Sequence, residues 1–239
     1  MNLDLVLSPK KEKENHKEYA YRLLRDNIMA LHILPGTVIN EGELSELLNI
    51  SRTPVHEAVM KLKDEMLVDV FPQRGSQVSR LDTKAFREGL FLRLTVEPAI
   101  LIRITGHVHS GYLDRLRENL EQQSQIVEQA WEWEKKIKEF LKTDDQFHRI
   151  IYEAAQMPHI WAAVRSVNSH YDRIRYMDAL VNHVDLEKLH QHHKRIFYYL
   201  LLGGMSEEEV RQFYAAHLSG YEKNLQHILE TYAEYFTQI

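Results

Sequence analysis

One stretch decides how the first third of the chain folds: Asn49-Ile50-Ser51-Arg52-Thr53-Pro54-Val55-His56-Glu57-Ala58-Val59. Ser51 or Thr53 can cap a helix start, because either hydroxyl accepts a hydrogen bond from a backbone N–H that the first turn leaves unpaired. Pro54 then falls in the first turn, where its missing N–H costs nothing. The stretch therefore predicts a short helix that begins near Ser51.

The exposed start of this predicted helix carries polar groups. Val55 and Val59 continue as one apolar stripe, which leaves Arg52, Thr53 and His56 on the opposite face. A cation and small polar groups at a capped helix start are what the second helix of a helix-turn-helix presents to DNA. An ordinary surface helix is the alternative, and the flanking segments decide between the two.

The flanking segments complete a winged helix-turn-helix. Residues 16–31 have helical apolar spacing, and Asn40 to Glu43 has the pattern of a capping box for a second helix that ends near Leu48. After the Ser51 helix, two β-rich runs at 68–71 and 76–79 are separated by a turn. We expect a two-stranded wing with Arg74 at its tip.

The order and spacing of these segments resemble those of the GntR family of bacterial transcription regulators. The matching residues are Leu34-Pro35-Gly36, Glu43-Leu44-Ser45-Glu46-Leu47, Ser51-Arg52-Thr53-Pro54-Val55, Glu57-Ala58-Val59 and Pro72-Gln73-Arg74-Gly75. The resemblance implies that Arg52, Thr53 and His56 meet base edges and phosphates, and that Arg74 and Gly75 enter the minor groove of operator DNA.

Three positions depart from the family pattern. His56 stands where the family usually has Arg, Gly42 where some members have a DNA-contacting Arg, and Met66 where Gly is usual. Loss of a guanidinium at position 56 removes a side chain that can read guanine with two hydrogen bonds. We therefore expect an operator that differs from those of relatives with Arg at this position.

Composition excludes several classes of protein. The 239 residues contain no Cys, so a disulfide framework and a Cys-type zinc site are excluded. No run reaches the roughly 18 apolar residues of a membrane span, so we expect a cytoplasmic protein with no membrane partner. The net charge is -5, and residues 1–80 hold 11 Lys and Arg against 12 Asp and Glu, so DNA affinity must come from local geometry.

The fold class we predict is mostly α, with a flexible arm at 1–15, the winged domain at 16–80 and an all-helical domain at 81–239. In the last region the apolar spacing is helical throughout. It predicts a bundle of about six helices, at 83–106, 110–130, 133–156, 158–180, 185–202 and 206–235.

Polar residues interrupt the apolar stripes of three of these helices. Asp144 and His148 lie one turn apart on one inward face, and His193 and His217 interrupt two others. A buried polar ring without a partner costs about 1–3 kcal/mol, so these groups need partners. A divalent metal would satisfy all four, and imidazoles with a carboxylate suit Zn²⁺, Ni²⁺ or a similar ion. A set of separate hydrogen bonds is the alternative.

His190 and His192 are rival candidates to His193. The helical phase places His192 with Lys188 and Arg195 on the solvent side, which favours His193.

The same pattern resembles the FCD-type effector domain of the FadR branch of the GntR family. It is carried by Asp144-Asp145-Gln146-Phe147-His148, His193-Lys194-Arg195-Ile196 and His217-Leu218. The resemblance implies a divalent metal, zinc in the first instance, held by Asp144, His148, His193 and His217. It also points weakly toward regulators of sugar-acid catabolism.

Arg93 and Glu97 lie on a further inward stripe, where they can form an i,i+4 ion pair. As a functional alternative, Arg93 clamps a carboxylate effector beside the metal and Glu97 orients it, since Arg binds carboxylates with two parallel hydrogen bonds. We assign Arg175 to the same effector site, although the pattern does not exclude Arg173.

We therefore expect a homodimeric, DNA-binding regulator that senses a metal and a small carboxylate. A metalloenzyme acting on an organic acid is the rival from another class, because His and carboxylate ligands also build catalytic sites. A metal with a purely structural role is a third hypothesis.

Overall fold

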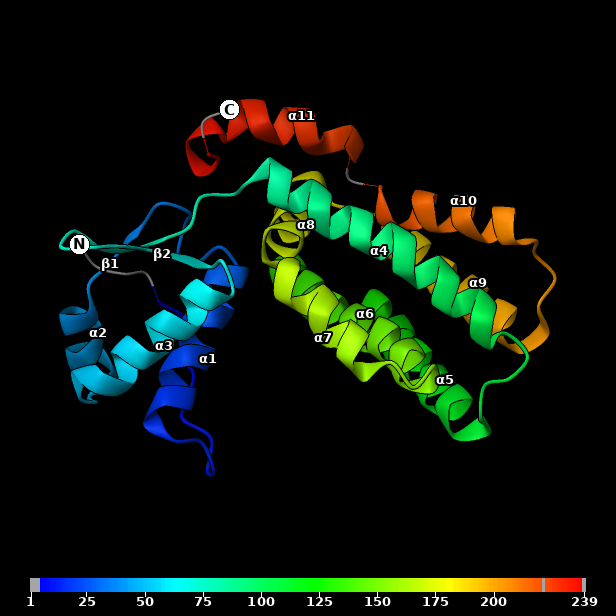
Figure 1. Cartoon of the computed structure of the whole chain (residues 1–239), viewed down its shortest axis with the longest axis horizontal. Coiled ribbons are helices and arrows are strands. Elements are labelled where there is room, and N and C mark those ends of the chain that lie inside the picture. Colours follow the sequence, from blue (N-terminus) through cyan, green and yellow to red (C-terminus); the bar gives the residue numbers. More distant parts are fainter. Residues whose placement is uncertain (1–4, 221, 238–239) are drawn as a thin grey trace. The chain divides into compact units, whose positions relative to one another are not determined.

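The computed structural model describes residues 5–220 and 222–237, which divide into two compact units. One unit contains the chain up to Phe86 together with 166–174 and the C-terminal end from Ile228; the other contains 87–165 and 175–227. Because the units are discontinuous in sequence, they do not coincide with a single cut after residue 80. Helices and strands are labelled in Figure 1.

The N-terminal part of the first unit is a winged helix-turn-helix. Its elements are α1 (His16–Met29), β1 (Val38–Ile39), α2 (Glu41–Leu48), α3 (Arg52–Asp64), β2 (Val68–Phe71) and β3 (Gly75–Val78). α3 packs on α1 and α2 over a core of aliphatic side chains, including Leu24, Leu44, Val55, Val59 and Leu62. The apolar stripe of α3 is therefore buried, and the polar start of α3 is exposed to solvent.

The wing has three strands rather than two. β3 lies between β1 and β2, with Val38 opposite Gln77 and Val68 opposite Val78 in antiparallel register. We missed β1 because two residues are too few to show an alternating pattern.

Two predicted caps differ in detail. Ser51 occupies the N-cap of α3, but its side chain makes no capping hydrogen bond. Asn40 caps α2 by accepting from the N–H groups of Gly42 and Glu43, yet Glu43 accepts from the Asn40 side-chain amide instead of from its backbone. The capping box that we predicted here is therefore only half formed.

The segment for which we predicted a flexible arm contacts α1 through several hydrogen bonds. The Asn27 side chain accepts from the Val6 N–H and donates to the Val6 carbonyl. Arg22 donates to Ser8 and Glu14. Residues 1–4 lie outside the described part of the chain.

The helices that follow are α4 (Thr83–Ile104), α5 (Ser110–Glu128), α6 (Trp133–Ala154), α7 (Pro158–Val167), α8 (Ser169–Asn182), α9 (Leu186–Leu202), α10 (Glu207–Leu218) and α11 (Glu222–Thr231). α5 packs along both α6 and α9 (Figure 1). Four predicted helices match to within two residues at each end.

The other two predicted helices are each split, so the described residues from 81 onward form eight α-helices in place of the six expected, and a short 3-10 helix follows at Ala233–Tyr235. The predicted helix 158–180 is interrupted at Asn168, whose backbone carbonyl accepts from the Asp172 N–H as α8 starts. Asn favours helix starts over helix interiors. The predicted helix 206–235 ends at Leu218, before Ser219 and Gly220, because Gly is a poor helix former.

Candidate functional site

The polar start of α3 is exposed as predicted. Arg52, Thr53 and His56 all lie on the surface, and His56 Nδ1 is 3.1 Å from both carboxylate oxygens of Glu41. Gly42 leaves room for Arg52, since a Cβ at position 42 would come within 3.3 Å of the guanidinium. A larger residue at position 42 would therefore displace the Arg52 side chain.

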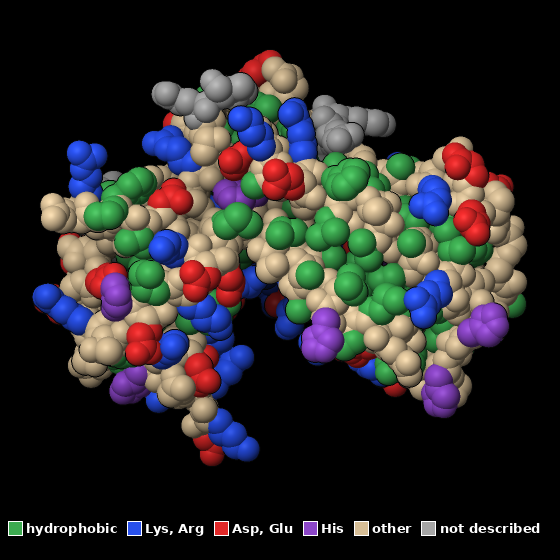
Figure 2. Space-filling view, viewed as in Figure 1, with side chains coloured by type: hydrophobic (Ala, Val, Ile, Leu, Met, Phe, Trp, Pro, Cys, Tyr) green, Lys and Arg blue, Asp and Glu red, His purple; other side chains and the backbone are tan. Residues whose placement is uncertain are grey.

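The tip of the wing is also exposed. Arg74 and Gly75 follow Gln73, and both Gln73 and Gly75 have positive φ, at 61° and 91°. Figure 2 shows Lys and Arg mixed with Asp and Glu over the visible face of the winged unit, at the left. Contacts with DNA phosphates must therefore come from a few individual basic side chains rather than from a continuous basic surface.

Three buried histidines from three helices meet in the helical unit. His148 on α6, His193 on α9 and His217 on α10 each offer a ring nitrogen within 4.8 Å of the others. The Nε2 atoms of His148 and His217 are 3.3 Å apart. One of these two nitrogens can donate to the other, but His193 Nε2 has no hydrogen-bond partner within residues 5–220 and 222–237, so the three rings are a better set of metal ligands than a hydrogen-bond network.

Asp144 lies beside this cluster, one turn before His148. Its Oδ1 is 3.2 Å from His193 Nε2, and its Oδ2 accepts from Arg175 at 2.6 Å. Burial alone would raise the pKa of Asp144, but Arg175 and His193 outweigh burial and hold this pKa well below its usual range. The carboxylate is therefore ionised although it is buried.

The outer nitrogens of two of the histidines are held by a second set of side chains. His148 Nδ1 is 2.9 Å from Glu97 Oε2, and His193 Nδ1 is 2.7 Å from Gln123 Oε1. Acceptors at Nδ1 place the proton there and leave Nε2 as a free lone pair, which is the usual support for metal-binding histidines. Among the described residues, His217 Nδ1 has no hydrogen-bond partner.

Burial favours the neutral form of two of the three histidines. It lowers the pKa of His193 to about 4, against the opposing effect of Asp144, and holds the pKa of His217 well below its ordinary value. Glu97 has a pKa of about 2, since Arg93 and His148 outweigh the effect of burial. A divalent cation binds histidine in its neutral form and carboxylate in its ionised form, so the lowered pKa values of His193, His217 and Asp144 all favour the metal-binding forms.

The predicted effector residues form the ion pair described above as the alternative. Arg93 Nε donates to Glu97 Oε1 at 2.6 Å, and each side chain is only 2% exposed. Glu97 therefore joins Arg93 to His148, which places the guanidinium next to the histidine cluster.

The two candidate arginines of α8 have different contacts. Arg175 contacts Asp144 and, at 3.0 Å, Asp145. Arg173 is fully buried in the other unit, where it donates to the Ser79 carbonyl at 2.8 Å and the Ser79 hydroxyl at 3.0 Å. Only Arg175 contacts the cluster.

Sequence reasoning missed Gln123. It donates to Asn119 at 2.8 Å, and Asn119 donates in turn to the Thr143 carbonyl. Both side chains are buried on α5 beside Leu116 and Leu120. Two amides four residues apart on an otherwise apolar face were the available signal.

His192 differs from its predicted place on the solvent side. It is half-buried, and its ring centroid lies 5.3 Å from Phe213 and 5.5 Å from His217. α10 covers this face of α9, which the phase of α9 alone does not reveal. His190 is buried but is not among the grouped histidines.

The comparisons with known proteins agree on one family. Residues 16–78 match the family model of bacterial regulatory proteins of the gntR family, and residues 88–220 match the FCD domain. The HTH-type transcriptional repressor RspR of Escherichia coli K12 is 31% identical over 219 residues, covering 91% of this chain and 92% of the relative. The chain belongs to the GntR family.

Solved structures of this family share the fold. A putative GntR regulator from Rhodococcus sp. RHA1 has a TM-score of 0.70 at 20% identity, covering 88% of this chain and 97% of that one. E. coli McbR/YncC has a TM-score of 0.65 at 18% identity, with coverage of 91% and 99%.

This GntR-family protein is therefore a DNA-binding transcription regulator with an FCD domain, and its relatives are regulators rather than enzymes. In the described part of the chain, the helices are all too short or too polar to cross a membrane.

Proposed function

We propose that this regulator binds a divalent metal through Asp144, His148, His193 and His217, with Arg93 as the clamp for a small carboxylate effector. The observation that carries the proposal is the convergence of three buried histidine nitrogens within 4.8 Å. Zinc is the metal that three imidazoles and a carboxylate suit best, with nickel as the alternative. A bound cation would supply a positive charge to which an effector carboxylate is attracted.

The alternative to a metal is a hydrogen-bonded core. The donor set argues against it, because two buried ring nitrogens, His193 Nε2 and His217 Nδ1, have no hydrogen-bond partner among the residues that the structure describes. The supporting acceptors at His148 and His193 also orient lone pairs toward one another, which separate hydrogen bonds would not require.

The proposed DNA contacts are Arg52, Thr53 and His56 from α3, with Arg74 and Gly75 from the wing. Their exposure and their place at a helix start and a hairpin tip support this role. A homodimer would present two such helices to a pseudo-palindromic operator. Leu202, at 76% exposed, and Leu201, at 42%, are apolar surface on α9 that a second copy of the chain would cover.

Effector binding alters operator affinity only if the effector favours one arrangement of the protein. α8 offers a connection, because Arg175 holds Asp144 while Arg173, two residues earlier, holds Ser79 just after β3. A movement of Asp144 on effector binding would therefore act on α8 through Arg175, and α8 also donates hydrogen bonds, through Arg173, to the segment that follows the wing.

A thermal-shift screen of small carboxylates and sugar acids tests the sensor. It compares metal-loaded protein, EDTA-treated protein, R93Q and the double variant R93Q/E97Q, which removes both charges of the buried pair and so controls for misfolding. We expect one acid to raise Tm only in the metal-loaded wild type. If EDTA lowers Tm and the acids leave Tm unchanged in every sample, the metal has a structural role and the sensor proposal is wrong.

A further inference from the structure

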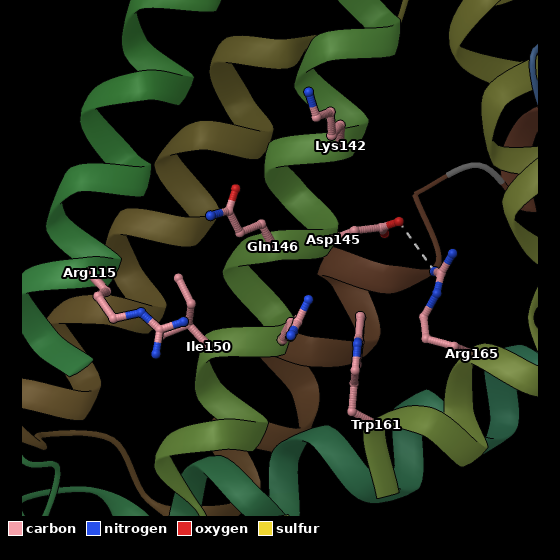
Figure 3. Close-up of a pocket in the computed structure, with 8 residues that line it drawn as sticks. Arg115, Lys142, Asp145, Gln146, Ile150, Trp161 and Arg165 are labelled. Atoms are coloured by element: carbon pink, nitrogen blue, oxygen red, sulfur yellow. Dashed lines mark ion pairs between the residues drawn. The ribbon is translucent and has the colours of Figure 1, made fainter. Parts of the chain in front are cut away.

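A second feature of the helical unit lies outside the histidine cluster. A cavity of about 410 Å³ opens between α5, α6 and α7 (Figure 3). It is lined by Arg115, Lys142, Asp145, Gln146, Arg149, Ile150, Trp161 and Arg165. None of the four proposed metal ligands lines it, so it is a separate site.

The lining is strongly cationic, with four basic side chains and one carboxylate. Arg115 and Arg149 share a single acidic partner, since both donate to Glu153 at 2.8 Å. Each of these contacts uses one nitrogen of a guanidinium that carries five N–H donors. Arg115 and Arg149 can therefore each donate to an anionic oxygen of a ligand while they keep their hydrogen bonds to Glu153.

The ion pairs of Lys142 and Arg165 are longer. Lys142 Nζ is 3.5 Å from Glu139 Oε2, and Arg165 NH1 is 3.3 Å from Asp145 Oδ2. The Lys142 pair is exposed, and exposed pairs contribute about 0–1 kcal/mol, so a ligand with several negative oxygens can compete for this cation.

Trp161 supplies an aromatic wall. Its ring centroid lies 5.3 Å from that of Tyr152, and the Arg165 guanidinium lies 5.6 Å from the Trp161 ring. Figure 3 shows Trp161 and Arg165 on α7 with Asp145 facing Arg165 across the marked ion pair. An indole beside cations favours a ligand with a compact carbon frame between its charged groups.

We propose that this cavity binds a small organic polyanion with at least two carboxylate or phosphate groups. Its volume lies in the usual range of small-molecule sites, about 300–1,000 Å³. The charged lining selects against neutral compounds and favours multiply charged ones.

The cavity is linked to the histidine cluster by two adjacent carboxylates. Asp145 accepts from Arg175 NH2 at 3.0 Å, and Arg175 NH1 donates to Asp144 at 2.6 Å. A polyanion that draws Arg165 away from Asp145 changes the charge that Arg175 and Asp144 experience. The expected linkage to metal affinity rests on the proposed function; polyanion binding itself does not.

Tryptophan fluorescence and calorimetry on the full chain test the site, with citrate and fructose 1,6-bisphosphate as probes and glucose as the uncharged control. We expect at least one polyanion to change the fluorescence, and W161F to lose that change. R149Q should weaken binding by about tenfold or more, as loss of a charge-assisted hydrogen bond implies. The matched control is R117Q, an exposed arginine of α5 that pairs with Asp114 and does not line the cavity.

Comparison of the two probes shows whether carboxylate or phosphate is preferred. No binding of either probe at millimolar concentration overturns the proposal, as does equal weakening in R117Q and R149Q. Binding must persist in EDTA-treated protein and in R93Q, since a polyanion that needs the metal occupies the histidine cluster instead. Failure of the protein to take up metal would refute the proposed function and leave this site standing.

Discussion

Gln123 offers a direct test of how the histidine cluster is held. Its Oε1 lies 2.7 Å from His193 Nδ1, and its amide donates to Asn119. Gln123→Ala removes both contacts and leaves the His193 ring free to choose the other tautomer. The variant should bind Zn²⁺ about 10–100-fold more weakly, the usual effect of losing such a support.

The same substitution should destabilise the metal-free protein. Leaving a buried donor without its acceptor costs about 1–3 kcal/mol. For a chain of this length that corresponds to a Tm lower by roughly 2–12 °C. The matched control is Gln122→Ala, because Gln122 is the exposed neighbour on the same helix.

Calorimetric titration of EDTA-treated protein with Zn²⁺ measures the affinity, and thermal unfolding measures the stability. The reasoning is refuted if Gln123→Ala and Gln122→Ala bind Zn²⁺ as tightly as the wild type does. That result would mean that packing alone orients His193.

Three further predictions concern the winged unit and its surroundings. Met66 has a φ of 57°, a left-handed conformation that is costly for every residue with a Cβ. Met66→Gly should therefore raise the free energy of unfolding, measured by urea titration, by about 1 kcal/mol. A lower free energy of unfolding in the variant would contradict this prediction. Burial, with a smaller effect of Arg173, lowers the pKa of His170 to about 4, so the unfolded chain takes up this proton first as pH falls. The free energy of unfolding should therefore fall as the pH is lowered from 6.5 toward 4. His170→Asn should reduce this fall, and a pH dependence of unfolding equal to that of the wild type would contradict the prediction. His56→Arg should select operators with an added guanine contact, and recovery of the wild-type operator would show that position 56 does not read bases.

The winged domain was predictable because its signals are local. Caps, turn residues and apolar periodicity placed α1, α2, α3 and the hairpin from nearby residues alone. The splits at Asn168 and Gly220 were not visible in the apolar spacing, which continues through both breaks. The contact of Asn27 with Val6 joins residues 21 apart and has no local signal.

The histidine cluster was predictable for a different reason. Asp144 and His148 are one helical turn apart, so the sequence itself places them on one face. Arg173 and Arg175 differ by two residues, and both side chains are enclosed once neighbouring segments are in place, so the choice between them needed tertiary contacts. Gln123 was missed because its contact with His193 joins residues 70 apart, on α5 and α9, and no local pattern shows which helices pack together.

The most direct test of the account is the metal content of the purified full chain. Elemental analysis after dialysis against Zn²⁺ should find one ion per chain, retained in the control Gln122→Ala and lost in the double variant H193A/H217A. A wild-type chain without bound metal, or a double variant that holds as much as the wild type, would contradict the proposal that these histidines form a metal centre.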